Sequence, residues 1–202
     1  MGLFDWLKGP KTTAQTEDLI WLTRQAKFAA VQREVADALA DPDGPDAIFV
    51  VAHFQDCLDE SQSLAADARW DQDRVFVTKS DTLEAQAGQA AADPSLRILI
   101  VVVERHPLPS HDDALRDFAR SLSSQCRFVQ HVSLEDPLLR LFAGDWVEQV
   151  LRQLGMQEND AIESRMVARR IRTAQEKIAA RARGDAPAES AAAWLKENCP
   201  GI

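Results

Sequence analysis

The sequence predicts a three-layer α/β domain, with a short and mainly parallel sheet of about four strands and a helical extension after it. Two observations support this class. Short continuous apolar runs recur along the chain, and segments with apolar residues at helical spacing separate them. Strands joined by helices of this length make right-handed crossovers, so the strands run parallel and helices cover both faces. The predicted strands are 47–52, 74–78, 97–103 and 128–132.

Helices are predicted before, between and after these strands. The first, from Thr16 to Ala40, has apolar residues at helical spacing and acidic residues at its start, where the helix dipole favours them. The breaker cluster DPDGPD ends it. The strand at 97–103, RILIVVV, is the most hydrophobic and is expected at the centre of the sheet. The remaining predicted helices are 55–68, 80–91, 110–123, 137–143, 145–154, 161–183 and 188–197.

The expected division of the chain has three parts. Residues 1–15 form an N-terminal amphipathic segment and linker, 16–155 the α/β domain, and 156–202 the helical extension. Residues 1–8 would place aromatic side chains on one helical face, which favours weak contact with a membrane surface, although docking on the domain explains the pattern equally well. The sequence shows neither a membrane-spanning run nor a signal peptide, so we expect a cytoplasmic protein, with a peripheral position at the inner face of the membrane as an option.

The composition narrows the class of partner. The chain has 202 residues and a formal net charge of −9, and 46% of its residues are hydrophobic, which suffices for a sizeable core. An acidic surface repels phosphate backbones, so nucleic acid is not expected as the main partner. The three cysteines are not at metal-ligand spacing, and their odd number argues against a disulfide framework. We therefore expect a reducing compartment, no metal and no cofactor.

The stretch from Ser133 to Arg183 carries the motifs of a known family in order and without a gap. They are Ser133 with Glu135-Asp136, then Arg140, Phe142, Asp145 and Val147, then Leu154-Gly155-Met156, Ala161-Ile162-Glu163, and Ala174-Gln175 with Lys177 and Arg181. This pattern resembles the SecA family, the motor ATPases of bacterial protein export. Earlier segments are similar to the same family, namely Asp18-Leu19-Ile20, Lys27-Phe28, Gln86-Ala87-Gly88 and Glu104-Arg105-His106. The resemblance implies the second RecA-like, helicase C-terminal-like motor domain of that family and the start of its helical scaffold.

Departures from the family pattern imply that the motor chemistry is lost. No Walker A pattern, G-x-x-x-x-G-K-[ST], occurs in the 202 residues, and the family motif A-G-R-G-T-D has no counterpart. The two arginine-finger positions fall on Phe118 and Ser121, and only Arg116 is retained. Arginine fingers stabilise the charge of the transferring phosphate. The resemblance therefore implies a non-catalytic domain that acts as a binding or regulatory module, with a protein partner such as a translocase motor or a membrane component.

Polar residues at the carboxyl ends of the strands are the candidates for a ligand site, because open α/β sheets bind ligands there. Glu104, Arg105 and Arg116 are the predicted remnants of a cofactor-binding cleft. A small enzyme or nucleotide sensor that reuses this cleft, with Asp56 and Asp112 added, is the alternative function. Structural roles compete with both predictions. For Glu104 and Arg105 the alternatives are an ion pair retained from the cleft and a structural role, and for His111, Asp112 and Asp113 they are a metal or acid–base cluster and a helix cap.

Three further features have competing interpretations. Asp56 follows the first predicted strand, as a phosphoacceptor of a receiver-like domain would, but Val103 is not followed by the Lys-Pro that such domains need. Cys57 has no activating pattern and is expected in the core. The basic face of the helix at 161–183 is either an interaction surface or a solvated face with acidic partners on the same chain. The predicted interaction residues are Arg165, Arg169 and Arg172.

Overall fold

The computed structural model describes residues 15–141, 157, 160–162 and 165–201. Five strands form one sheet in the order β1-β5-β4-β2-β3, and every neighbouring pair is parallel. Their bounds are β1 Gln15–Trp21, β2 Ala47–Ala52, β3 Val75–Lys79, β4 Arg97–Val102 and β5 Gln125–Ser133. The three-layer α/β class is confirmed, and β4, the most hydrophobic strand, is central as predicted. Within the described residues, no helix has the length and apolar character needed to cross a membrane.

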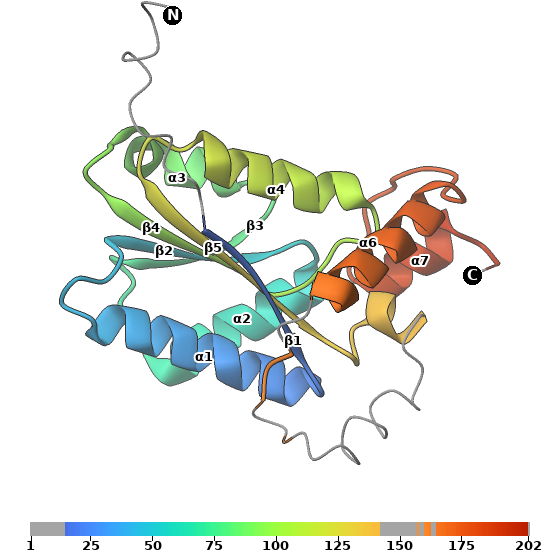
Figure 1. Cartoon of the computed structure of the whole chain (residues 1–202), viewed down its shortest axis with the longest axis horizontal. Coiled ribbons are helices and arrows are strands. Elements are labelled where there is room, and N and C mark those ends of the chain that lie inside the picture. The colour runs from blue at the N-terminus through green and yellow to red at the C-terminus, as the bar shows by residue number, and fades with distance from the viewer. Residues whose placement is uncertain (1–14, 142–156, 158–159, 163–164, 202) are drawn as a thin grey trace, which may run out of the picture.

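Helices cover both faces of the sheet, and two more lie at one end of it. Figure 1 shows α1 and α2 below the sheet and α3 and α4 above it, whereas α6 and α7 lie together beyond the ends of the strands. The helices are α1 Arg24–Ala40, α2 Gln55–Ala68, α3 Leu83–Ala92, α4 Pro109–Ser121, α6 Arg165–Ala179 and α7 Ala191–Asn198. Helix α2 has the predicted bounds, and the other described helices differ from their predictions at one or both ends.

The prediction of one helix from Thr16 to Ala40 is wrong in its first third. Residues Gln15–Trp21 form β1, which pairs with β5 along its whole length. The run from Leu19 to Leu22 is continuously apolar and buried because both of its faces are covered: Leu19 and Trp21 belong to the cluster with α1, and Ile20 and Leu22 to the cluster with α6. The helix begins only at Arg24, after Thr23, whose side chain accepts a hydrogen bond from the N–H of Ala26. The spacing of apolar residues in a strand followed by a capped helix therefore resembled that of one continuous helix.

The C-terminal predictions are confirmed in part. Residues 137–141 are helical, as predicted, but the rest of that helix, the helix at 145–154 and the glycine at 155 lie outside the described residues, as does the domain boundary at 155/156. Residues 161–162 are not helical. Ile162 forms an antiparallel bridge with Ile20 of β1, and α6 follows only at Arg165.

Three buried clusters hold these layers together. Alternate residues of β2 show the division, because Ile48, Val50 and Ala52 face α1 and α2, while Ala47, Phe49 and Val51 face α3 and α4. The third cluster lies at the end of the sheet, where residues such as Ile20, Val132 and Leu138 meet Ile171 and Ile178 of α6 and Trp194 of α7. Trp194 is 1% exposed and anchors α7 in this cluster. The third cluster fixes the helical extension against the carboxyl ends of the strands.

Candidate functional site

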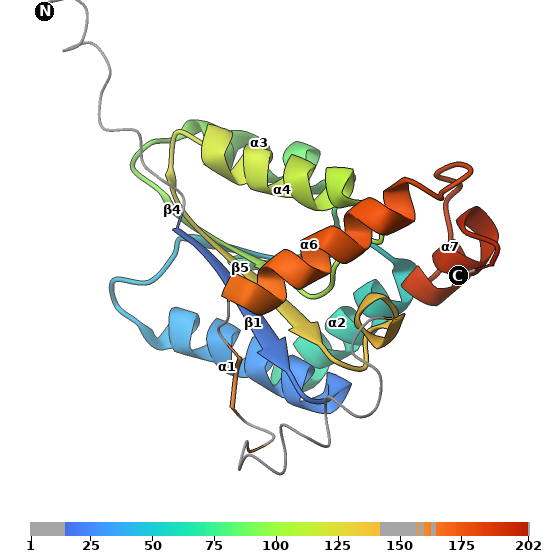
Figure 2. The same ribbon diagram turned by 45° about the vertical axis from the view of Figure 1, so that its right-hand side comes forward.

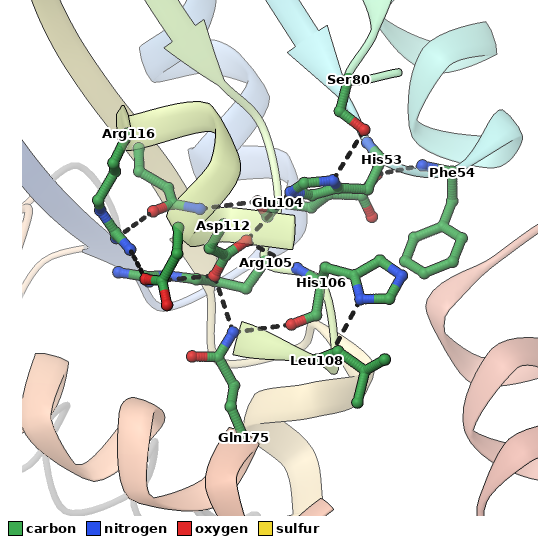
Figure 3. A network of polar contacts seen from close by, with 12 residues as sticks. His53, Phe54, Ser80, Glu104, Arg105, His106, Leu108, Asp112, Arg116 and Gln175 are labelled. Atoms are coloured by element: carbon green, nitrogen blue, oxygen red, sulfur yellow. Dashed lines mark hydrogen bonds and ion pairs between the residues drawn. The ribbon is translucent and has the colours of Figure 1, made fainter. Parts of the chain in front are cut away.

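The carboxyl ends of the parallel strands bring together polar residues that are far apart in the sequence. His53 follows β2, Ser80 follows β3, and Glu104 to His106 follow β4, while Asp112 lies in the first turn of α4. Figure 3 shows His53 and Arg105 beside Asp112, with Gln175 reaching in from α6 and Ser80 on the other side of the His53 ring. This edge is where α/β sheets bind ligands. In this chain, residues of the protein itself occupy much of it.

Asp112 is the centre of the network. Its carboxylate accepts hydrogen bonds from His53 Nε2 at 3.0 Å, Arg105 Nη1 at 3.2 Å, the His106 N–H at 3.1 Å and Gln175 Nε2 at 2.7 Å. The side chain is fully buried. Burial alone would raise the pKa of Asp112, but the hydrogen bond from His53 and the charge of Arg105 lower it well below its usual value. Asp112 is therefore an ionised acceptor with four donors around it.

Glu104 holds the backbone of the neighbouring loop. Its Oε1 accepts the N–H groups of His53 and Phe54, each at 2.9 Å. Burial raises the pKa of this carboxyl group, although the nearby His53 and these N–H donors oppose the rise. The contacts of the described residues place Arg105 elsewhere, so the suggested ion pair between Glu104 and Arg105 does not form. Glu104 positions the residues that follow β2.

Arg105 and Arg116 converge on Asp18 of β1. Arg105 Nη2 lies 2.7 Å from its carboxylate, and Arg116 Nη2 lies 3.3 Å from the same oxygen. Arg116 also donates to Gln130 Oε1 of β5 at 2.7 Å. Burial and the neighbouring Arg105 lower the pKa of Arg116, but a guanidinium group stays charged at neutral pH. The three predicted cofactor-binding residues are thus neighbours, but their polar groups bind other parts of this chain.

The structure changes the interpretation of the other strand-end residues. The suggested cap at the start of α4 is wrong, because Leu108 is the N-cap residue and makes no side-chain bond, while Asp112 lies inside the first turn. Asp56 lies in the first turn of α2 with its side chain 44% exposed. Cys57 is 1% exposed, which confirms its place in the core, and burial raises the pKa of its thiol.

The basic helix contributes to this edge as well as to the surface. Arg172 Nη1 lies 2.7 Å from the Asp113 carboxylate of α4, and Arg172 Nε lies 3.4 Å from Glu176. Arg169 and its neighbour Arg170 are exposed. The side chain of Arg165 lies outside the described residues. The interpretation as a face with acidic partners holds for Arg172, whereas Arg169 stays a candidate for external contacts.

Three of the four histidines gather beside the network. The ring centroids of His106 and His111 are 3.8 Å apart, and His53 lies 5.4 Å from His106. His106, His111 and Asp185 have potential metal-ligand atoms within 4.8 Å of one another. A metal bound to His106 Nε2 would require the ring proton to lie on Nδ1. However, the Leu108 N–H donates to His106 Nδ1 at 3.0 Å, so Nδ1 is an acceptor in this structure. The present arrangement is better suited to hydrogen bonding, as between His111 Nε2 and Asp185 at 2.7 Å.

Sequence reasoning missed Ser80, Gln175 and Asp18. Ser80 Oγ lies 3.0 Å from His53 Nδ1, at the rim of a cavity of about 270 Å³ that Ser80 and His111 help to line. The position of Ser80 directly after a strand was the available signal, since every strand end in a parallel sheet reaches this edge. Gln175 belongs to one of the family motifs, but no local pattern indicated its contacts with Asp112 and the His106 carbonyl, which span more than sixty residues of sequence.

Residues that carry the family resemblance also meet in space. Lys27 Nζ lies 2.7 Å from the Asp136 carboxylate, and both side chains are buried. Next to them, the N–H of Arg24 donates to Glu135 at 2.6 Å. The start of α1 is thereby joined to the turn that follows β5. These contacts connect two motifs that the sequence separates by more than a hundred residues.

Comparison with known proteins supports the same relation. The chain is 35% identical over 121 residues to the protein translocase subunit SecA of Stenotrophomonas maltophilia, an alignment that covers 60% of this chain and 12% of that protein. Identity with SecA of Xanthomonas oryzae is 36% over 121 residues, covering 60% and 13%, and with SecA of Xanthomonas campestris 42% over 81 residues, covering 40% and 9%. This chain is a relative of SecA. No protein-family model matches it.

The relation extends over a small part of SecA. The aligned region of the SecA-related chain spans 9–13% of the length of these curated relatives. Among solved structures, the C-terminal part of the Fun30 ATPase domain overlaps with a TM-score of 0.39 at 12% identity, covering 76% of this chain and 54% of the other. An overlap this loose supports no conclusion about function.

Proposed function

We propose that this chain is a SecA-related domain that does not hydrolyse ATP by itself and acts as a binding or regulatory module in protein export. The observation that carries this proposal is the internal use of the candidate cleft residues. Glu104 binds two backbone N–H groups, while Arg105 and Arg116 bind Asp18. Stabilising a transferring phosphate requires cationic groups aimed at the phosphate oxygens. To do so, the two arginines would have to leave the Asp18 carboxylate, and Arg116 would also have to leave the buried Gln130 amide.

The helical extension also blocks the side of the candidate cleft that faces α6 and α7. Figure 2 shows α6 beside α4, with α7 at the same end of the molecule. Gln175 of α6 donates to Asp112 at 2.7 Å and to the His106 carbonyl at 2.8 Å. Trp194 of α7 packs edge-on against His106 at 5.3 Å between ring centroids. A nucleotide that entered along this side would have to displace α6 and α7 from a buried apolar cluster.

The exposed cations of α6 provide the surface for a partner. Arg169, Arg170 and Lys177 of α6, and Arg181 just after it, are exposed on a chain whose net charge is −9. Concentrated positive charge on an otherwise acidic protein favours an acidic partner surface and accelerates association with it. The kinship with SecA makes the translocase motor the first protein to test.

A nucleotide titration tests the first half of the proposal. Purified full-length chain is titrated with fluorescent ADP and ATP, with and without magnesium, and phosphate release is measured in parallel. We expect no saturable binding up to about 1 mM nucleotide, which corresponds to less than about 4 kcal/mol of binding free energy, and no hydrolysis. Micromolar binding that Arg116→Gln abolishes would contradict the proposal and favour a nucleotide sensor.

A binding measurement with purified SecA from the same cell tests the second half. The variant R169E/R170E reverses two exposed charges on α6, and R69E/R120E reverses two exposed charges elsewhere, so both variants have the same net charge. We expect the α6 variant to weaken binding at least tenfold and the control to change it less than twofold. Equal effects of the two variants, or no binding of the wild type, would count against this surface.

A small enzyme that uses the strand-end cleft is the second candidate. One observation favours it, namely the open cavity beside Ser80 and His111, which the side chains of the helical extension do not line. Its chemistry would not depend on ATP.

A further inference from the structure

Three residues at the carboxyl edge of the sheet have the arrangement of an activated serine. We propose that Ser80 is a nucleophile, with His53 as its general base and Asp112 as the residue that orients the base, and that this centre accepts short acyl groups from uncharged or cationic esters and thioesters. The proposal goes beyond a role in protein export, because the reaction needs neither nucleotide nor partner.

The contacts define the direction of proton transfer. Asp112 Oδ1 lies 3.0 Å from His53 Nε2, and Ser80 Oγ lies 3.0 Å from His53 Nδ1. An ionised carboxylate can only accept, so Nε2 carries the proton and Nδ1 of the neutral imidazole is an acceptor. The Ser80 hydroxyl therefore donates to Nδ1. A nucleophile within hydrogen-bond reach of a base that a third group orients is the general signature of nucleophilic catalysis.

Neighbouring side chains and backbone groups hold all three residues in place. Glu104 fixes the His53 N–H at 2.9 Å, and the Ser80 N–H donates to the Ala52 carbonyl at 2.9 Å. Asp112 is held by Arg105, Gln175 and the His106 N–H. The His53 and Asp112 side chains are 1% and 0% exposed, whereas Ser80 is half-buried. The base is thus rigid and shielded, while the hydroxyl can be reached.

A donor for the negative charge of the reaction lies next to the nucleophile. The N–H of Asp81, the residue after Ser80, has no hydrogen-bond acceptor within the described part of the chain. It is followed by the first turn of α3, whose initial N–H groups have no partner within the helix. The N–H after a nucleophile is a common oxyanion donor, and one such donor is worth about 10²–10³ in rate.

The cavity beside Ser80 determines the substrate class. It has a volume of about 270 Å³, its apolar wall contains Leu83, Leu115 and Phe118, and Asp81 and Glu84 bring negative charge to its lining. The small volume selects short acyl groups, and the carboxylates disfavour anionic substrates.

The reaction is balanced by the residues present. Ser80 Oγ attacks the carbonyl carbon of the ester as its proton passes to His53 Nδ1, and a C–O bond forms. The bond to the leaving alcohol or thiol then breaks, and that group takes the proton from His53. Water repeats the sequence on the acyl-serine, which releases the acid and restores the hydroxyl.

A fluorophosphonate probe tests the proposal on the full-length chain, because it forms a phosphorus–oxygen bond with an activated serine and releases fluoride. We expect one adduct per chain, located on Ser80 by tandem mass spectrometry, and slow hydrolysis of p-nitrophenyl acetate. Ser80→Ala removes one half-buried hydroxyl and should abolish both. His53→Gln should slow labelling by about 10²–10⁴-fold, the usual contribution of a general base.

The matched control is Ser95, whose hydroxyl donates to the Asp93 carboxylate at 2.6 Å without a histidine. Ser95→Ala should label as the wild type does, and circular dichroism melting curves show whether each variant is folded. Absence of an adduct on Ser80, labelling of Ser95 at the same rate, or unchanged labelling in a folded His53→Gln would overturn the proposal. None of these outcomes depends on whether the chain binds ATP or SecA.

Discussion

Breaking the ion pair between Lys27 and Asp136 should cost this protein a large part of its stability. Lys27 Nζ and Asp136 Oδ1 are 2.7 Å apart, and their side chains are 0% and 7% exposed. Lys27→Met removes the cation and leaves a buried carboxylate, which keeps only the donors of Ser133. Removing one partner of a buried pair costs about 3–5 kcal/mol. In a chain of this size that lowers Tm by about 6–20 °C.

The pH of the measurement follows from the pKa of Lys27. Burial alone would lower that pKa, but the charge of Asp136 holds it above its usual value of 10.5. A raised pKa in the folded state stabilises the protein fully below the unfolded value, and this contribution is lost only as the pH rises through the folded value. Urea unfolding at pH 7, monitored by circular dichroism, therefore measures the whole contribution.

An exposed pair on the same protein gives the control. Arg120 and Asp117 are 3.1 Å apart, with side chains 59% and 73% exposed, so Arg120→Met should cost less than about 1 kcal/mol. Adding Asp136→Asn to Lys27→Met removes the unpaired charge and should recover part of the loss. A Lys27→Met variant no less stable than Arg120→Met would refute the reasoning, because it would mean that the carboxylate relaxes into water.

The remaining predictions concern acid, the helical extension and one turn. Burial lowers the pKa values of His106 and His131 to about 3. Below pH 6.5 the unfolded state therefore binds more protons than the folded state, and the free energy of unfolding should fall as the pH drops from 6.5 towards 3. His131→Gln should flatten this dependence in acid-unfolding curves. Trp194→Ala should cost about 3–5 kcal/mol and should increase hydrogen exchange in α6 and α7 more than in the sheet. An equal loss of protection in all elements would argue that α6 and α7 do not unfold as a separate unit. A Cβ at Gly44 would collide with the carbonyl oxygens of Ala38 and Asp41. Gly44→Ala should therefore destabilise the protein by about 1–3 kcal/mol in urea unfolding. An unchanged urea midpoint would show that the backbone of the turn moves to accommodate the methyl group.

Much of the fold could be predicted because the apolar pattern of most segments matches the burial of those segments in the layers of the structure. The apolar runs at β2 and β4 are continuous since both faces of these strands are covered, and that is the pattern of a parallel sheet. β1 could not be separated from α1 by periodicity, because Leu19 and Leu22 fit a helical period as well as a strand. Only the pairing with β5, more than a hundred residues away, decides between them.

The location of the candidate site could be predicted from the sequence, but the pairing of its side chains could not. A parallel sheet sends every strand end to one edge, so Glu104, Arg105 and the residues after β2 were expected there. Which side chains pair depends on helices whose position the local sequence does not fix. Arg105 binds Asp18 because β1, mistaken for a helix, lies at the edge of the sheet beside β5.

The same geometry links the helical extension to the proposed serine centre through Asp112. Asp112 takes a donor from α6 through Gln175 and a donor from the β2 loop through His53, so one buried carboxylate joins the helical extension to the sheet. A substitution at Asp112 should therefore disturb both the docking of α6 and the tautomer of His53. These effects can be separated, because Gln175→Ala removes only the contact with α6. If Gln175→Ala loosens α6 in hydrogen exchange and leaves Ser80 labelling intact, the carboxylate serves two independent roles. Loss of both together would mean that the helical extension holds the serine centre in place.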